Sequence, residues 1–202
     1  LKVIEDSAES IGAAYQGKKC GSFGDASIFS FYPNKQMTTG EGGLILTDDK
    51  KIADLCWSMA NQGRKQGQGK WLEHVRLGYN YRMTEMQAAL GLAQLRRLPE
   101  MLKKRAAAAA LYSRLLSEEK RIILPARHAS QGEAGGPRSQ PGSKRTWFVY
   151  VITLTSRFTR QDRDAIVRLM AKKGVQCGTY FEPIHLQPFY RQAFGFKPGY
   201  LP

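Results

Sequence analysis

Hydrophobic residues form short runs near the start of the chain and recur at helical spacing further along it. The short runs predict three strands, separated by glycine-rich turns, at residues 2–4, 26–31 and 43–47. A helix is predicted over residues 50–61, and Gly63 is suited to the left-handed conformation that ends a helix. Strands combined with helices in this way favour a mixed α/β fold.

The middle of the chain predicts two helices and a linker. Thr84 and Gln87 have the spacing of a capping box, which opens a helix through residue 97. Beyond the proline that follows, five consecutive alanines favour a longer helix over residues 100–120. Residues 125–145 hold three prolines, four glycines and three serines, and this composition predicts a flexible linker.

Regular patterning resumes after the linker. A strand is predicted over residues 147–154, an amphipathic helix over residues 162–173, and a short strand over residues 174–177. The tail of the chain therefore has a βαβ-like order.

The helix that opens at Thr84 is apolar around much of its circumference. The positions concerned are Met86, Ala89, Leu90, Leu92, Ala93 and Leu95. A pattern of this kind indicates burial on more than one side. Two interpretations fit it, a central core helix and a helix at a subunit interface.

Lys35 is the first residue whose surroundings indicate chemistry. It follows the apolar strand at residues 26–31 and precedes a glycine-rich turn, and no other cation lies beside it in the sequence. An amine at such a junction, walled by aromatic residues, is partly desolvated, so it can lose its proton and attack a carbonyl. Schiff-base chemistry requires such an amine, and the alternative is an ordinary solvated lysine at a turn.

Asp6 stands 29 residues before Lys35, where the first predicted strand meets its loop. Ligands of open α/β sheets bind at the carboxyl ends of the strands. A carboxylate there needs a charged partner, because an unpaired buried charge is costly. The pyridinium nitrogen of pyridoxal phosphate (PLP) would be such a partner, and its protonated ring is an electron sink.

Three ordered blocks of the sequence resemble the DegT/DnrJ/StrS family of PLP-dependent nucleotide-sugar aminotransferases. They occupy residues 4–43, 77–95 and 180–190 and read IEDSAESIGAAYQGKKCGSFGDASIFSFYPNKQMTTGEGG, LGYNYRMTEMQAALGLAQL and YFEPIHLQPFY. The resemblance implies a fold-type I (aspartate-aminotransferase-like) α/β architecture. It also implies transfer of an amino group, with glutamate as the donor, to a nucleotide-linked keto sugar for amino-sugar or surface polysaccharide biosynthesis.

The resemblance also assigns roles to residues around the cofactor. It implies that Lys35 is the lysine bonded to PLP and that Asp6 is the partner of the pyridine nitrogen. Ser30 falls where the family has a phosphate-contacting serine, and Asn80 where an asparagine reaches the cofactor phosphate of the neighbouring subunit. Glu9 stands where the family usually carries Gln or His near the ring hydroxyl, so its role is open.

Substrate contacts and assembly follow from the same resemblance. Arg82, Tyr180 and His185 are the candidate substrate contacts. Each also has a structural interpretation, as a surface ion-pair partner, a packed aromatic and a loop histidine respectively. The expected partners are a nucleotide-sugar substrate, an amino-acid donor and a second copy of the chain, in a homodimer with shared active sites.

The resemblance divides the chain into four parts. Residues 1–98 are expected to belong to the large PLP-binding domain, residues 99–124 to a connecting helix, residues 125–145 to the linker, and residues 146–202 to the small C-terminal domain. Members of the family are considerably longer than 202 residues. We therefore expect the chain to be part of a longer protein.

The net charge of +14 is uneven along the chain. Residues 1–50 carry a net charge of −2, residues 51–145 carry +11 and residues 146–202 carry +5. The basic excess therefore lies away from the proposed chemistry. It could attract nucleic acid, steer a nucleotide diphosphate, or be neutralised by the rest of the longer protein. No nucleic-acid recognition motif accompanies it, which makes nucleic-acid binding the weaker interpretation.

The remaining composition argues against several other kinds of site. Three widely spaced cysteines and three scattered histidines predict neither a disulfide framework nor a metal site, and they favour a reducing cytoplasm. No apolar run approaches the roughly 20 residues of a membrane helix.

Two further classes of function remain open. Some relatives of the family carry His in place of the lysine and dehydrate sugars, and Lys35 argues against that activity. A non-catalytic or regulatory PLP-binding relative is the other alternative, since Glu9 departs from the family pattern.

Overall fold

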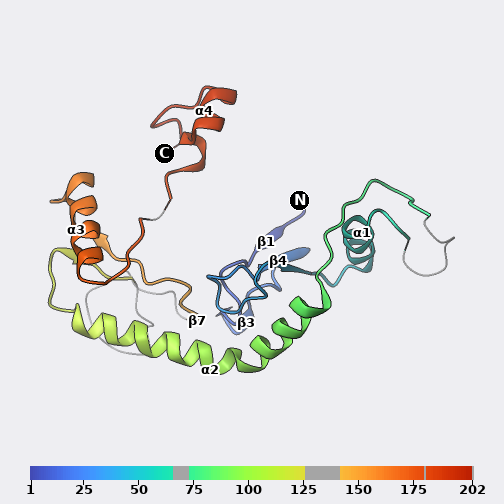
Figure 1. The fold of residues 1–202 in the computed structure, drawn as a ribbon, viewed down its shortest axis with the longest axis horizontal. Helices are drawn as coiled ribbons and strands as arrows, with labels where there is room; N and C mark the ends of the chain where they lie inside the picture. Colours follow the sequence, from blue (N-terminus) through green and yellow to red (C-terminus); the bar gives the residue numbers. More distant parts are fainter. Residues whose placement is uncertain (66–72, 126–141, 180, 202) are drawn as a thin grey trace. The chain divides into compact units, whose positions relative to one another are not determined.

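The computed structural model describes residues 1–65, 73–125, 142–179 and 181–201. These residues form two compact units, Leu1–Thr153 and Leu154–Pro202, whose elements are coloured by sequence in Figure 1. The four-part division expected from the sequence concerns domains of the complete protein and stays a prediction.

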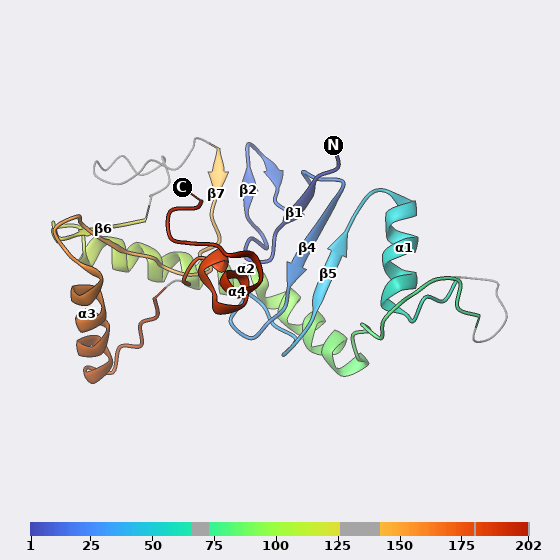
Figure 2. The ribbon, with the colours of Figure 1, turned by 90° about the horizontal axis from the view of Figure 1, so that it is seen from above.

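Three strands form the main sheet of the first unit. β4 (Ala26–Ser30) is central, parallel to β1 (Ile4–Asp6) and antiparallel to β5 (Gly43–Leu46), as Figure 2 shows. The register pairs Asp6 with Ile28, so β1 and β4 end at the same edge of the sheet. The three predicted strands are confirmed, although β1 begins at residue 4 and not at residue 2.

A second, smaller sheet includes part of the predicted linker. Its strands are ordered β3-β2-β7, from Lys18–Lys19, Ala14–Tyr15 and Ser143–Lys144. The expectation of a linker without structure through residue 145 was therefore wrong at its end, where β7 pairs with β2. Backbone pairing of this kind needs no apolar side chain, so composition did not reveal it. Residues 126–141 lie outside the described residues.

The first helix, α1 (Lys50–Ala60), begins where the sequence predicts and ends one residue earlier. The Asp49 side chain caps it by accepting hydrogen bonds from the backbone N–H groups of Lys51 and Ile52. Gly63 lies three residues beyond the helix with φ of 75°, and its N–H donates to the carbonyl of Ser58 within the helix. The left-handed glycine therefore reverses the chain after α1.

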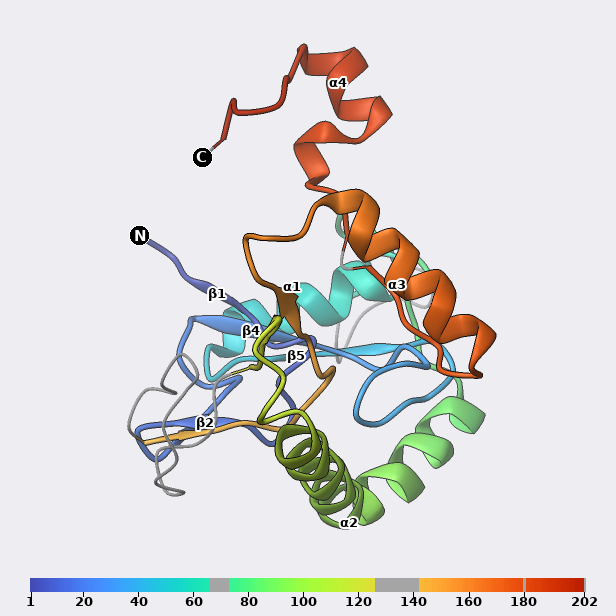
Figure 3. The same ribbon diagram turned by 90° about the vertical axis from the view of Figure 1, so that its left-hand side faces the viewer.

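The second helix, α2 (Glu85–Leu115), is one continuous helix of 31 residues. The capping box of Thr84 and Gln87 is confirmed. The prediction of two helices separated at Pro99 was wrong, since Pro99 lies inside α2. A proline removes one backbone hydrogen bond and bends a helix without necessarily ending it. The helix is visibly bent in Figure 1 and Figure 3.

Packing explains why α2 continues past its proline. Leu98 is buried with Phe31 and Met37, and Met101 and Leu102 on the other side of Pro99 pack against the same cluster. One apolar core therefore holds both halves of the helix. Gly12 permits the contact, because a Cβ there would lie 2.7 Å from Leu102 Cδ1.

The segment after β7 differs from its prediction. A strand was expected over residues 147–154, but only β8 (Thr153–Leu154) forms, paired with β6 (Ile122–Ile123). The preceding residues bind α2 instead. The carbonyls of Trp147 and Phe148 accept hydrogen bonds from Arg105, and the Tyr150 hydroxyl lies 2.8 Å from Ser113 Oγ. Side-chain partners on α2 thus replace a neighbouring strand.

The second unit is mainly helical. α3 (Arg160–Lys172) begins at a capping box of Thr159 and Asp162, and it confirms the predicted helix with an earlier start. The short strand expected at residues 174–177 was wrong, since no strand forms there. The remaining elements are the 3₁₀ helix η1 (Ile184–Leu186) and α4 (Pro188–Phe194).

Candidate active site

The candidate site lies at the sheet edge where β1 and β4 end. Asp6 is the last residue of β1 and Ser30 the last of β4. Lys35 follows five residues after Ser30, in a turn that its backbone N–H closes on the Tyr32 carbonyl at 3.0 Å. Parallel pairing of the strands and a short turn thus place all three residues on neighbouring segments.

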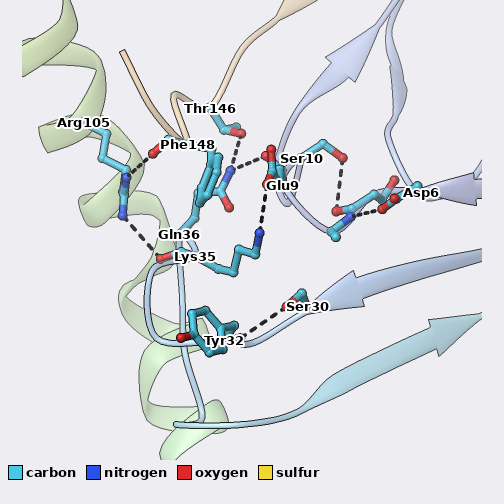
Figure 4. Close-up of polar contacts among 12 residues, drawn as sticks. Asp6, Glu9, Ser10, Ser30, Tyr32, Lys35, Gln36, Arg105, Thr146 and Phe148 are labelled. Atoms are coloured by element: carbon cyan, nitrogen blue, oxygen red, sulfur yellow. Dashed lines mark hydrogen bonds and ion pairs between the residues drawn. The ribbon is translucent and has the colours of Figure 1, made fainter. Parts of the chain in front are cut away.

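The side chain of Lys35 is enclosed by two groups distant in sequence. Its Nζ lies 2.9 Å from Glu9 Oε1 and 4.3 Å from the centre of the Phe148 ring (Figure 4). The side chain is 13% exposed, so this lysine is not the solvated surface residue of the alternative interpretation. A carboxylate on one segment and an aromatic face on another fix where the amine points.

Gln36, the next residue, ties the turn to both of those segments. It is buried, and its Nε2 donates to the Glu9 carbonyl at 2.6 Å and to Thr146 Oγ1 at 3.2 Å. Its Oε1 is buried with no hydrogen-bond partner in the described structure. The hydrogen bond from Gln36 to the Glu9 carbonyl therefore holds the Lys35 turn close to the loop that follows β1.

Asp6 and its neighbour Glu5 differ sharply in their surroundings. Glu5 accepts hydrogen bonds from the backbone N–H groups of Gly21 and Phe23 and from the Ser7 hydroxyl. Burial raises the pKa of Glu5, but these hydrogen bonds outweigh it and hold the pKa below its usual value. Asp6 is exposed, and within the described residues it accepts a single hydrogen bond, from the Ala8 N–H to Oδ1 at 3.1 Å.

The donor set at this edge fits PLP. Asp6 Oδ2 is open to a cationic N–H such as that of a protonated pyridine ring. The Ser30 hydroxyl accepts from the Tyr32 N–H at 3.3 Å and, among the described residues, has no acceptor for its own proton, so it can donate to a phosphate oxygen. Lys35 supplies the enclosed amine. A carboxylate, a hydroxyl and an amine are the groups that this cofactor needs.

Asn80 and Arg82 lie elsewhere in the first unit. Both are exposed, and Arg82 Nε donates to Asn80 Oδ1 at 2.9 Å. The backbone around them is hydrogen-bonded to the end of α1, with the Tyr79 N–H on the Met59 carbonyl at 2.6 Å. In the described part of the chain no hydrogen bond joins either residue to Lys35. Their roles stay predictions.

The structure does not test the two other candidate substrate contacts, His185 and Tyr180. His185 is on η1 in the second unit, where its ring meets the Phe196 ring edge-on with centres 6.2 Å apart. Tyr180 lies outside the described residues. Both assignments stay predictions.

Sequence reasoning missed Gln36, Arg105 and Phe148 around the lysine. One signal could have found Arg105. It continues the stripe of α2 that includes Leu98, Leu102 and Ala109, at the spacing of a buried helix face. A charged residue on such a stripe needs buried partners. No comparable signal marks Phe148, because the contact depends on how distant segments meet.

Other classes of site are not found in the described part of the chain. None of its helices has the length and apolar character needed to cross a membrane. No three metal-ligating side chains gather in it. Cys20, Cys56 and Cys177 are free thiols.

Comparison with known proteins agrees with this geometry. The family model of the DegT/DnrJ/EryC1/StrS aminotransferase family matches residues 1–202. The chain belongs to this family. Its structural neighbours are PLP-dependent transferases of fold type I, and the chain forms part of that fold. The resemblance in sequence and the predicted fold class are therefore confirmed.

Three relatives illustrate the match. The GDP-perosamine synthase of Caulobacter vibrioides is 36% identical over 94% of this chain and 47% of its own length. PseC of Helicobacter pylori, an aminotransferase involved in pseudoaminic acid biosynthesis, has a TM-score of 0.85 at 29% identity, over 98% of this chain and 50% of its own. Spr1654 of Streptococcus pneumoniae in its PMP-form has a TM-score of 0.81 at 25% identity, over 96% and 47%. The chain spans about half the length of these relatives.

Proposed function

We propose that the protein containing this chain is a PLP-dependent aminotransferase that transfers an amino group, with glutamate as donor, to a nucleotide-linked keto sugar. The observation that carries the proposal is the enclosed amine of Lys35 in the turn after β4, together with the open carboxylate of Asp6 at the end of the neighbouring strand β1. Membership of the aminotransferase family, and relatives that include a GDP-perosamine synthase, support it.

Each residue at the edge has a task in this proposal. Lys35 Nζ would hold the cofactor covalently, Asp6 would hold its ring N–H, and Ser30 would donate to its phosphate. When bound, PLP supplies an electron sink for charge at the amino carbon. Lys35 Nζ also takes up and returns the proton that moves during transfer.

Glu9 acts on the lysine itself. Its carboxylate is 2.9 Å from Lys35 Nζ, so it holds the ammonium in place whenever the amine is not covalently engaged. Phe148 covers the same amine and limits its access to water. This arrangement gives a task to a residue that departs from the usual family pattern.

The remaining roles in this proposal are the contacts with the substrates and with the neighbouring subunit. Arg82, Tyr180 and His185 would contact the substrates. Asn80 would serve the cofactor phosphate of the neighbouring subunit in a cytoplasmic homodimer with shared active sites.

Trapping the lysine tests the proposal. The full-length protein, loaded with PLP, is reduced with borohydride, digested and analysed by mass spectrometry. We expect the reduced cofactor on Lys35, and we expect Lys35→Ala to lower transamination at least about a thousandfold, because the covalent anchor and the proton carrier are lost together. Lys50→Ala is the control, since Lys50 is exposed and paired with Asp54 on α1.

The outcomes separate the candidate functions. Label on another lysine, or near-normal activity of Lys35→Ala, contradicts the proposal. Label on Lys35 without transamination of any nucleotide-linked keto sugar supports a PLP-binding regulatory relative instead.

A further inference from the structure

Arg105 on α2 connects two segments that meet at the lysine. Its half-buried guanidinium donates to three backbone carbonyls, from Nη1 to Trp147 at 3.2 Å and to Phe148 at 3.1 Å, and from Nη2 to Lys35 at 3.3 Å. Figure 4 shows the guanidinium between the Lys35 turn and the segment that carries Phe148. One side chain thus bridges residues 35 and 148.

The three acceptors are significant because of what their residues do. One is the carbonyl of Lys35 itself. Another belongs to Phe148, whose ring centre lies 4.3 Å from Lys35 Nζ. Arg105 therefore fixes the backbone at both ends of the contact between the amine and its aromatic cover.

A guanidinium suits this task better than any other cation. Its planar fork presents five N–H groups in fixed directions, so a single group can serve acceptors on two segments. In the described part of the chain no carboxylate pairs with Arg105, and its guanidinium donates to backbone carbonyls. The adjacent Lys104, by contrast, is 71% exposed and paired with Glu100 on the helix surface.

We propose that Arg105 is a positioning residue that fixes Lys35 Nζ between Glu9 and the Phe148 ring. The proposal rests on the proposed role of Lys35 in catalysis. Without the bridge, the Lys35 turn and the Phe148 segment keep the Gln36 hydrogen bonds but lose their common attachment to α2. A reacting group displaced by about 1 Å can lose roughly a hundredfold in rate.

The first measurement uses the full-length protein without cofactor. Reductive methylation followed by mass spectrometry gives the labelling rate of Lys35 relative to Lys2, which is 77% exposed. In Arg105→Met we expect this ratio to rise at least about threefold, since local opening uncovers the amine. Lys104→Met is the matched control on the same helix and should leave the ratio unchanged.

The second measurement uses the protein loaded with PLP. We expect kcat of Arg105→Met to fall about 10- to 100-fold, with KM for both substrates within about twofold of the wild-type value. Arg105→Lys should restore little of the loss, because one ammonium cannot serve carbonyls on two segments. If Arg105→Met does not fold, Arg105→Lys decides by the same two measurements.

The outcomes are distinct from those of the proposed function. An unchanged labelling ratio overturns the positioning role, and so does a raised ratio with unchanged kcat, which would leave only a structural attachment. If borohydride trapping at Lys35 fails in the wild-type protein, the proposed function is overturned, and the labelling ratio of Arg105→Met still decides whether Arg105 restrains Lys35 Nζ.

Discussion

The Lys35 turn and residues 77–95 differ in how far this chain covers their side chains. Glu9, Gln36 and Arg105 tie the turn from three directions. The second region, residues 77–95, presents large apolar side chains to solvent, and Met86 is 82% exposed. Residues of this chain enclose the Lys35 side chain, whereas the described residues leave apolar side chains of residues 77–95 exposed.

This difference shows which residues can be judged from one chain. Lys35 has Glu9 and Phe148 of this chain as partners, so the position of its amine is defined. Asn80 and Arg82 contact each other at the surface, beside the exposed aromatic rings of Tyr79 and Tyr81. A large exposed apolar patch marks an interaction surface. The exposed apolar residues at the start of α2 therefore favour a subunit-interface helix over a central core helix. The homodimer stays a prediction.

The largest effect is expected at Asp6. Asp6→Asn keeps the shape of the side chain but removes the charge that would hold a protonated ring, so we expect a loss of about a thousandfold or more in kcat. Little change in the free energy of unfolding should accompany it, because Asp6 is exposed and accepts one local hydrogen bond. Steady-state kinetics and urea unfolding of the full-length protein measure both. A loss of only a few fold would remove Asp6 as the partner of the ring nitrogen.

An intermediate effect is expected on mixing two damaged full-length proteins. Lys35→Ala and Asn80→Ala should each be weak alone. A mixed dimer would rebuild one intact site, giving recovery of up to about a quarter of wild-type activity after random exchange. The measurement is activity against mixing time, with subunit exchange followed by native mass spectrometry. Complete exchange without recovery would mean that Asn80 serves its own chain.

The smallest effect on activity is expected at Glu5. Glu5→Gln leaves one of the Gly21 and Phe23 N–H groups poorly paired, so we expect a loss of about 1–3 kcal/mol in the free energy of unfolding with kcat retained. Because the folded-state pKa of Glu5 is lowered, its stabilising contribution is complete above the unfolded-state pKa and is lost as pH falls through the folded value.

Urea unfolding of both proteins between neutral and acidic pH measures this contribution. The difference between wild type and Glu5→Gln should shrink on acidification. A difference that does not change with pH would show that the carboxylate charge of Glu5 is not what stabilises the loop.

The sequence predicted the start or end of a helix correctly where the residues that cause it lie within a few positions. The Thr84 capping box and the left-handed Gly63 after α1 are two examples, because each depends on the residue type at one position and on backbone close to it. Pro99 misled the prediction because a core formed by Phe31 and Met37 keeps α2 continuous across it. No local pattern reports such a core.

The sequence by itself determined the family, the main strands, and the candidate residues Lys35, Asp6 and Ser30, because these follow from motifs and strand patterns along the chain. Only the tertiary structure decided that Glu9 and Phe148 enclose the amine and that Arg105 ties both segments to α2. These contacts join residues 26 to 113 positions apart. They arise when the sheet edge, the loop and the helix pack together, and the separation of residues along the chain does not encode that packing.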